Sequence, residues 1–212
     1  MIDPDTIYMP KTIDDLLQDV KEDKVDNLST TSFAFKRDVW EFFHGDDKES
    51  PFRKMRCVEF GTHKGQTTRI LAHLFKHVYT INLPKHFDQA KALNKDLDNI
   101  SYIEMDLYRQ DVDVNFKHDP ISVFFIDAVH SFDAVMYDVT RALNLQLADD
   151  DVYFIFDDFG SYKEVFTAVS QLMRIGQLER VQYLGHKAGF NFGGSPERRL
   201  FDHEGIICKL KR

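Results

Sequence analysis

The stretch CVEFGTHKGQTTRILAHLF, residues 57–75, decides the fold predicted for this chain of 212 residues. Its first four residues form a mostly apolar run typical of a buried strand, and residues 70–75 carry apolar side chains at helical spacing. Gly61 and Gly65 lie between the two, where glycine permits positive φ and a close approach of the backbone to a ligand. The stretch therefore predicts a strand, a tight turn and a helix.

The same alternation of apolar runs and helical stretches continues to the end of the chain. Runs typical of strands lie at residues 57–60, 78–82, 101–104, 121–127, 152–156, 181–184 and 206–210. Strands alternating with helices predict an α/β fold, a doubly wound parallel sheet with helices on both faces. The runs 121–127 and 152–156 are almost wholly apolar, as in central strands that are covered on both faces. The last two runs are compatible with an antiparallel pair at one edge.

The N-terminal part has a helical pattern instead. Residues 1–56 are expected to form a helical extension, followed by the main domain over residues 57–212. Thr12 is placed to cap a first helix, with Asp15 three residues further on. A second helix is predicted over residues 33–43.

Composition limits the class of protein. No apolar run reaches the length of a membrane span and no apolar signal region begins the chain, so we expect a cytoplasmic protein without membrane contact. The net charge is −8 and the isoelectric point about 5.5, which argues against nucleic acid as a partner. Cys57 and Cys208 lie in apolar runs and are expected to be buried, reduced thiols. Composition leaves the oligomeric state open.

Three carboxylates follow the ends of two neighbouring predicted strands. Asp127 ends one apolar run, and Asp157 and Asp158 directly follow the next. The carboxyl ends of such strands form the crevice in which open α/β sheets bind ligands. Clustered carboxylates repel one another unless a cation or protons neutralise them, and oxygen donors suit Mg²⁺. The three residues are therefore a candidate metal site; the alternative is a helix cap at Asp158 and a loop role for Asp127.

His130 lies three residues after Asp127, in the predicted loop over the strand ends. An imidazole has an ordinary pKa of about 6.5 and accepts protons at neutral pH. His130 is therefore a candidate general base. A plain surface histidine is the alternative, and the neighbouring carboxylates favour the catalytic interpretation.

The turn after the first strand does not fit two common nucleotide-binding motifs. A P-loop requires Gly-Lys-Ser/Thr, whereas this chain has Gly65-Gln66-Thr67. A dinucleotide fingerprint requires a middle glycine, whereas this chain has His63. A nicotinamide-dependent oxidoreductase is therefore disfavoured.

Glu59 followed by Gly61-x-x-x-Gly65 resembles the motif of class I S-adenosylmethionine (SAM) dependent methyltransferases, where the turn packs against the methionine part of SAM. The Asp127-x-x-His130 and Asp157-Asp158 motifs resemble those of the metal-dependent sugar O-methyltransferases of macrocin and mycinamicin biosynthesis. They are similar, more distantly, to the catechol O-methyltransferases. The resemblance covers residues 57–160.

The resemblance implies a seven-stranded, mostly parallel, Rossmann-like methyltransferase sheet with SAM as methyl donor. The implied acceptor is a sugar hydroxyl, such as that of a deoxyhexose like rhamnose in a glycan. Mg²⁺ is implied on Asp127, Asp157 and Asp158, and His130 is implied as general base, with Asp127 also at the catalytic centre. The SAM-binding residues implied or expected are Glu59, Gly61, Thr62, Gly65, Asn82, Asp106 and Asp127.

Two positions depart from that family. Asn82 stands where an acidic residue usually holds the ribose hydroxyls; its amide accepts one hydrogen bond and donates another, without charge. Asp149-Asp150-Asp151 replaces the usual Gly-Gly turn before the fifth strand. Asp106 matches a position that commonly contacts adenine, and a plain turn residue is an equal alternative. The loop 185–205 mixes aromatic and polar residues, so it is either a cover for a sugar acceptor or a plain connection.

Two other functions therefore stay open. One is a non-catalytic SAM-fold domain for binding or scaffolding, in which Asn82 would reflect a lost catalytic function. The other is a methyltransferase that acts on a different small-molecule hydroxyl.

Overall fold

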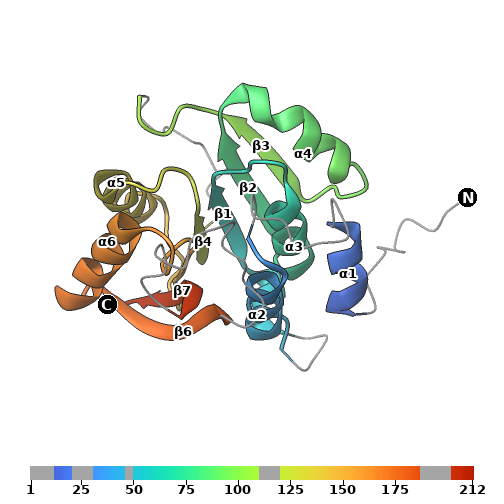
Figure 1. The fold of residues 1–212 in the computed structure, drawn as a ribbon. Helices are drawn as coiled ribbons and strands as arrows, with labels where there is room; N and C mark the ends of the chain where they lie inside the picture. The colour runs from blue at the N-terminus through green and yellow to red at the C-terminus, as the bar shows by residue number, and fades with distance from the viewer. Residues whose placement is uncertain (1–11, 21–30, 46–49, 110–119, 187–201) are drawn as a thin grey trace, which may run out of the picture.

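The computed structural model describes residues 12–20, 31–45, 50–109, 120–186 and 202–212 (Figure 1). Within these ranges, seven strands form one sheet in the order β3-β2-β1-β4-β5-β7-β6. The strands are β1 (Arg56–Phe60), β2 (His77–Asn82), β3 (Ile100–Glu104), β4 (Val123–Ile126), β5 (Tyr153–Phe156), β6 (Leu178–His186) and β7 (His203–Leu210). The helices are α1 (Ile13–Asp19), α2 (Phe33–His44), α3 (Gln66–Leu74), α4 (Phe87–Leu93), α5 (Phe132–Leu143) and α6 (Lys163–Arg174), with short 3₁₀ turns η1 (Pro51–Lys54) and η2 (Pro84–His86).

The pairing confirms the predicted doubly wound, mostly parallel sheet. Strand β1 pairs in parallel with both β2 and β4, so that Phe60 lies beside Ile81 and Ile126. The carboxyl ends of these three strands therefore meet at one edge of the sheet. The chain order reverses beside β1, and such switch points are where α/β sheets bind ligands.

The antiparallel pair at one edge also exists, with longer strands than the sequence predicts. Strand β7 inserts between β5 and β6 and runs antiparallel to both. Because β6 extends to residue 186 and β7 begins at residue 203, both ends of the expected loop 185–205 belong to strands. Residues 187–201, the larger part of the loop that was expected to be a cover for an acceptor or a plain connection, lie outside the described residues.

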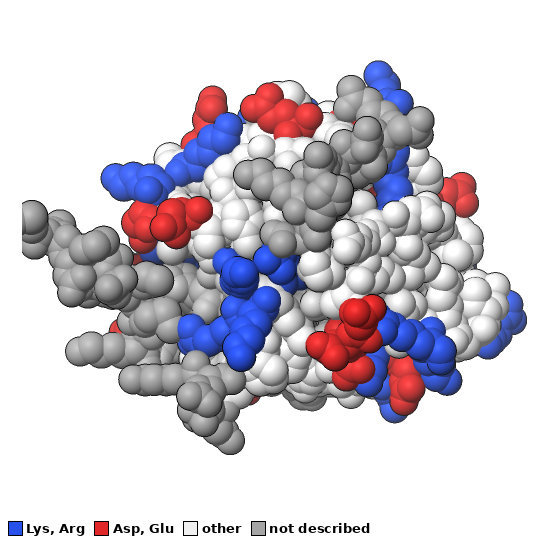
Figure 2. Space-filling view, turned by 180° about the vertical axis from the view of Figure 1, so that it is seen from behind, with Lys and Arg blue, Asp and Glu red and all other residues white. Residues whose placement is uncertain are grey.

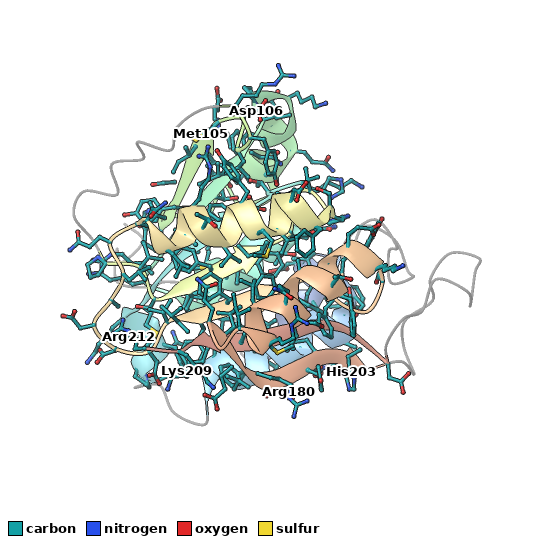
Figure 3. The ribbon with its side chains drawn as sticks, turned by 90° about the vertical axis from the view of Figure 1, so that its left-hand side faces the viewer. Met105, Asp106, Arg180, His203, Lys209 and Arg212 are labelled. Carbon is teal, nitrogen blue, oxygen red and sulfur yellow. The ribbon has the colours of Figure 1, made fainter. Side chains whose placement is uncertain are left out.

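Two hydrophobic cores fill the space on either side of the sheet. Successive residues of a strand point to opposite faces, so Phe124 packs in one core and Phe125 in the other. Helices α5 and α6 cover the first face (Figure 3), and α1, α2 and α3 cover the second (Figure 1). In Figure 3, Met105 and Asp106 lie at the β3 edge of the sheet, and Arg180 of β6 lies at the opposite edge.

The N-terminal helices pack against the main domain. Thr12 caps α1 as predicted, because its hydroxyl accepts from the Asp15 N–H while the Asp15 carboxylate accepts from the Thr12 N–H. Ser32 caps α2 by accepting from the Phe35 N–H at 3.0 Å. Phe35 and Phe43 of α2 are fully buried in the same core as the sheet. The helical extension and the sheet therefore share one hydrophobic core.

The structure adds one helix that the sequence analysis did not single out. Helix α4 buries Phe87 and Ala90, half-buries Leu93 and is otherwise exposed, so its apolar pattern is short. Cys57 and Cys208 are buried free cysteines, as predicted. Among the described helices, none has the length and apolar character that crossing a membrane requires.

Candidate functional site

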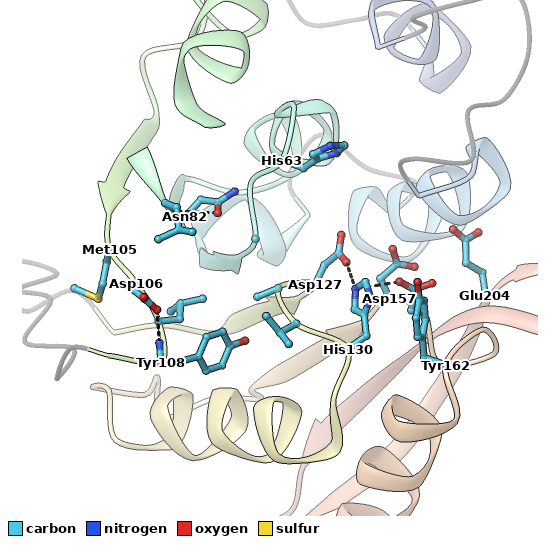
Figure 4. A pocket seen from close by; sticks show the side chains of 16 residues that line it. His63, Asn82, Met105, Asp106, Tyr108, Asp127, His130, Asp157, Tyr162 and Glu204 are labelled. Atoms are coloured by element: carbon cyan, nitrogen blue, oxygen red, sulfur yellow. Dashed lines mark hydrogen bonds and ion pairs between the residues drawn. The ribbon is translucent and has the colours of Figure 1, made fainter. Parts of the chain in front are cut away.

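A cavity of about 550 Å³ opens at the carboxyl ends of the central strands (Figure 4). One side, here called the β2–β3 side, is formed by residues that follow β2 and β3. The other side, here called the acidic side, is formed by residues that follow β4 and β5, together with one residue of β7. The β2–β3 side carries Asn82, Leu83, Met105, Asp106, Leu107 and Tyr108, and the acidic side carries Asp127, His130, Asp157, Asp158, Tyr162 and Glu204.

Glu59 lies beneath the turn between β1 and α3. Its carboxylate accepts hydrogen bonds from the Thr68 hydroxyl at 2.6 Å and the Thr80 hydroxyl at 2.5 Å. The side chain is fully buried, and burial raises the pKa of Glu59 to about 8 against the opposing effect of the two hydroxyls. Thr62 extends this network through its contact with Thr80 at 2.5 Å. These groups tie the turn to β2 and α3.

The two glycines of the turn are required by close packing. Gly61 has a φ of +99°, and a Cβ at this position would lie 2.0 Å from the carbonyl oxygen of Asp127. Gly65 has a φ of +80°, and a Cβ there would lie 2.7 Å from the Cβ of Ala90. Both positions combine a backbone conformation that favours glycine with a lack of space for a side chain. Gly61 thereby brings the end of β1 against the end of β4.

The predicted SAM residues divide into two groups. Gly61, Asn82, Asp106 and Asp127 line the cavity. Glu59, Thr62 and Gly65 are not among its lining residues. Glu59 and Thr62 hold the turn through hydrogen bonds to neighbouring elements, and Gly65 packs closely against Ala90.

Asn82 and Asp106 both make local backbone contacts at the mouth of the β2–β3 side. The Asn82 Oδ1 atom accepts from the Leu83 N–H at 2.8 Å, which leaves the amide NH₂ as its donor group. The Asp106 Oδ1 atom accepts from the Tyr108 N–H at 3.0 Å, and Oδ2 lies 3.3 Å from Nε of Arg109. Both side chains therefore hold the turns that shape this wall.

The acidic side brings a histidine between two carboxylates. The Nε2 atom of His130 lies 3.3 Å from Oδ1 of Asp127 and 3.1 Å from Oδ2 of Asp158. These three residues offer ligand atoms that all lie within 4.8 Å of one another, which is a spacing compatible with a shared metal ion. Because a carboxylate only accepts hydrogen bonds, Nε2 is the donor in this arrangement.

Burial and mutual repulsion perturb the acidic side. Burial, with the charge of Asp127, raises the pKa of Asp158 to about 6. Burial and the charges of Asp158, Asp127 and Glu204 raise the pKa of Asp157 well above its usual range. Burial lowers the pKa of His130, but the hydrogen bond to Asp127 and the charges of both aspartates outweigh it, so the net direction is upward. Perturbed groups that cluster in a cleft are typical of functional sites.

The observed cluster differs from the predicted metal set at one position. The sequence grouped Asp127, Asp157 and Asp158, whereas the structure groups Asp127 and Asp158 with His130. Asp158 has a φ of +56°, a turn that directs its carboxylate to His130. Asp157 still lines the cavity, and its Oδ1 atom is buried without a hydrogen-bond partner in the structure.

Two residues of the acidic side were not predicted from the sequence. Glu204 of β7 is buried and accepts from the Ser32 N–H at 2.8 Å and from the Ser32 hydroxyl. Burial raises its pKa to about 8. Tyr162 lies before α6, with its ring centroid 4.5 Å from that of His130. Glu204 is far along the chain from the Asp157-Asp158 motif, and only the insertion of β7 beside β5 brings it there.

Comparison with known proteins agrees with this architecture. Residues 58–159 match the family model described as a methyltransferase domain. The architecture is the Rossmann-like methyltransferase fold. The matched segment runs from β1 to the residues that follow β5, and it contains the turn at Gly61 and the whole Asp127 to Asp158 cluster. No curated protein matches this sequence significantly.

Solved structures show the same methyltransferase fold at low identity. Fibrillarin of Aeropyrum pernix, in complex with natively bound SAM, is 14% identical with a TM-score of 0.51 over 78% of this chain and 70% of its own. The N-methyltransferase NodS of Bradyrhizobium japonicum, in complex with S-adenosyl-L-homocysteine, is 13% identical with a TM-score of 0.51 over 84% and 97%. An rRNA methylase of Streptococcus thermophilus is 15% identical with a TM-score of 0.50 over 76% and 87%. These neighbours share the fold of this chain.

The expected exclusion of nucleic acid gains no support from these comparisons. The fold occurs in an rRNA methylase, so the fold itself does not exclude RNA. On the face shown in Figure 2, acidic and basic side chains of the described residues lie interspersed around one small basic group. The net charge of −8 is therefore the remaining argument against nucleic acid as a partner.

Proposed function

We propose that this chain is a SAM-dependent O-methyltransferase that acts on the hydroxyl of a saccharide or of another small molecule, assisted by a divalent cation. The observation that carries the proposal is the cluster of Asp127, His130 and Asp158 beside a cavity at the sheet's switch point. A hydroxyl is a very weak acid, so its methylation gains from a base and a Lewis acid placed together. An amine acceptor would need no metal.

The β2–β3 side is the proposed site for the adenosyl part of SAM. Asn82 offers its amide NH₂ to the ribose, and Asp106 offers a carboxylate at the position expected for adenine. Leu83, Met105 and Leu107 supply apolar surface in the same wall. A cavity of about 550 Å³ lies within the usual range for small-molecule sites, roughly 300–1,000 Å³. SAM, when bound, supplies an already activated methyl group.

The acidic side fits a divalent cation. Asp127 and Asp158 belong both to the predicted set and to the observed cluster, and the buried Oδ1 atom of Asp157 lacks a partner. An uncompensated buried carboxylate is costly, and a cation would offset that cost. We therefore propose Asp127 and Asp158 as ligands, with Asp157 completing the oxygen set. A bound cation would lower the pKa of a hydroxyl held beside it.

His130 is the proposed general base. With Nε2 engaged by Asp127 and Asp158, the ring is oriented and Nδ1 is the atom that can accept the proton of an acceptor hydroxyl. As that oxygen loses its proton it bonds to the methyl carbon, and the carbon–sulfur bond of the donor breaks. The protein contributes mainly alignment, because the donor is already reactive.

An assay with methyl-labelled SAM tests this proposal. The purified protein is incubated with Mg²⁺ and, in separate reactions, with a pyranoside mixture, catechol, total RNA and a protein lysate. We expect label in a small-molecule hydroxyl, and His130→Ala to lower kcat by roughly 10²–10⁴ with SAM affinity nearly unchanged. Label that enters RNA or protein alone would overturn the acceptor class. SAM binding without transfer to any acceptor would instead favour a non-catalytic domain.

A further inference from the structure

We infer that Tyr162 forms an acceptor platform, on which the C–H face of a pyranose ring packs while one of its hydroxyls faces His130. This inference rests on the proposed function and adds to it the residue that selects the acceptor. Tyr162 lies on the acidic side of the cavity, at the end away from Asn82 and Asp106 (Figure 4). It therefore lies beside the proposed base rather than beside the proposed nucleoside site.

The ring of Tyr162 is both close to His130 and open to the cavity. The two ring centroids are 4.5 Å apart with an angle of 43° between the ring planes. Even so, 43% of the Tyr162 residue surface is exposed. An aromatic ring that packs on a catalytic histidine and still keeps an accessible surface is suited to contact a ligand at that histidine.

The backbone holds this ring in a fixed place relative to the cluster. The N–H groups of Ser161 and Tyr162 both donate to the carbonyl oxygen of Asp158 at 3.0 Å. Phe159, inside the same turn, is buried at 2% exposure and packs on Phe166 of α6. The Phe166 N–H in turn donates to the carbonyl of Tyr162 at 3.0 Å. The turn that positions the Asp158 carboxylate therefore also positions the platform.

Most of the exposed large hydrophobic residues among those described line this cavity. Of the seven exposed large hydrophobic residues among those described, Leu83, Tyr108, Val129 and Tyr162 line it. Val129 precedes His130 and is 46% exposed. The acidic side thus places two apolar surfaces, Tyr162 and Val129, next to a strongly polar centre.

This pattern fits the chemistry of a pyranose. Such a ring has one face of weakly positive C–H groups, which the negative face of an aromatic ring attracts. Its equatorial hydroxyls point outward near the ring plane, where His130 and the carboxylates can reach one of them. A flat aromatic acceptor would also stack on Tyr162, and it is the competing outcome of the test below.

Saturation-transfer difference NMR measures this contact directly. The probes are methyl α-L-rhamnopyranoside, methyl α-D-glucopyranoside and catechol, each with Mg²⁺ and S-adenosyl-L-homocysteine. The variants are Tyr162→Ala, Tyr162→Phe and, as a matched control, Tyr137→Ala. Tyr137 is a tyrosine of similar exposure, 39%, that is not among the residues lining the cavity.

We expect saturation of the ring C–H protons of at least one pyranoside. Tyr162→Ala should weaken its binding by about tenfold, the equivalent of one good aromatic contact, whereas Tyr162→Phe and Tyr137→Ala should bind as the wild type does. Equal pyranoside binding by Tyr162→Ala would overturn the platform, as would a wild type that binds catechol alone or none of the probes. SAM affinity, measured by calorimetry on the same protein preparations without S-adenosyl-L-homocysteine, separates the two proposals: if SAM binds and no pyranoside does, the platform fails and the cofactor assignment stands.

Discussion

Replacing Glu59 with glutamine should stabilise the protein at alkaline pH and leave it unchanged in acid. Glu59 is fully buried beneath the turn between β1 and α3, and burial raises its pKa from 4.5 to about 8. The folded protein therefore holds this proton up to a higher pH than the unfolded chain does. The resulting stability is fully present below pH 4.5 and is lost as the pH rises from 4.5 to about 8.

The magnitude follows from the same two values. Each pKa unit corresponds to about 1.36 kcal/mol of differential interaction. Between pH 5 and pH 8, ionisation of Glu59 should therefore lower the free energy of unfolding by a few kcal/mol, on the order of 3–4 kcal/mol. Glu59→Gln keeps the size of the side chain and an oxygen that accepts from Thr68 and Thr80, and it carries no titratable proton.

The assay is urea unfolding in EDTA at pH 5, 6, 7 and 8, followed through Trp40, the single tryptophan, which is buried. Other buried carboxyl groups titrate in both proteins. The difference in free energy of unfolding between wild type and variant therefore reports on Glu59 alone. That difference should grow steadily with pH. Glu179→Gln, an exposed glutamate of β6, is the control and should show no such trend. Parallel pH profiles for wild type and Glu59→Gln would refute the reasoning.

Three further changes test the turn, the link to α2 and the metal. Gly61→Ala places a Cβ 2.0 Å from the carbonyl of Asp127, so we expect a loss of at least about 3 kcal/mol in urea unfolding together with weaker SAM binding; wild-type stability would contradict the packing. Ser32→Ala removes the cap of α2 and both side-chain bonds it makes, including its hydroxyl donor to Glu204, so it should cost about 2 kcal/mol, whereas Ser32→Thr should cost less. Exhaustive EDTA treatment should abolish turnover and Mg²⁺ should restore it, and Asp158→Asn should require about tenfold more Mg²⁺; undiminished turnover in EDTA would exclude a catalytic metal.

Much of the fold follows from local sequence patterns and was therefore predictable. The central parallel strands are short apolar runs because both of their faces are buried. Phe124 packs in the core on one face of the sheet, and Phe125 packs in the core on the other. The turn at Gly61 was predictable because glycine is the residue that this close approach to β4 allows. The length of β6 was not predictable, because the buried Leu178 at its start is followed by the exposed residues Glu179 and Arg180, which break the apolar pattern.

The candidate site was predictable only in part, since it depends on side-chain direction and on distant segments. Asp157 and Asp158 look equivalent in sequence, but Asp157 stays buried at the end of β5 while the positive φ of Asp158 turns its carboxylate to His130. Glu204 lies near them because β7 pairs with β5. Its carboxylate accepts a hydrogen bond from Ser32, the N-cap of α2, which lies 172 residues earlier in the chain. No local pattern carries such a contact.

Calorimetric titration with SAM tests the central claim most directly. The protein is titrated with SAM and with NAD, in EDTA and in Mg²⁺, alongside Asp106→Ala, which changes a residue of the proposed nucleoside wall. The account predicts one SAM per chain for the wild type in both conditions, weaker binding for Asp106→Ala and no heat from NAD. Absence of SAM binding by a folded wild type, or binding of NAD in its place, would contradict it.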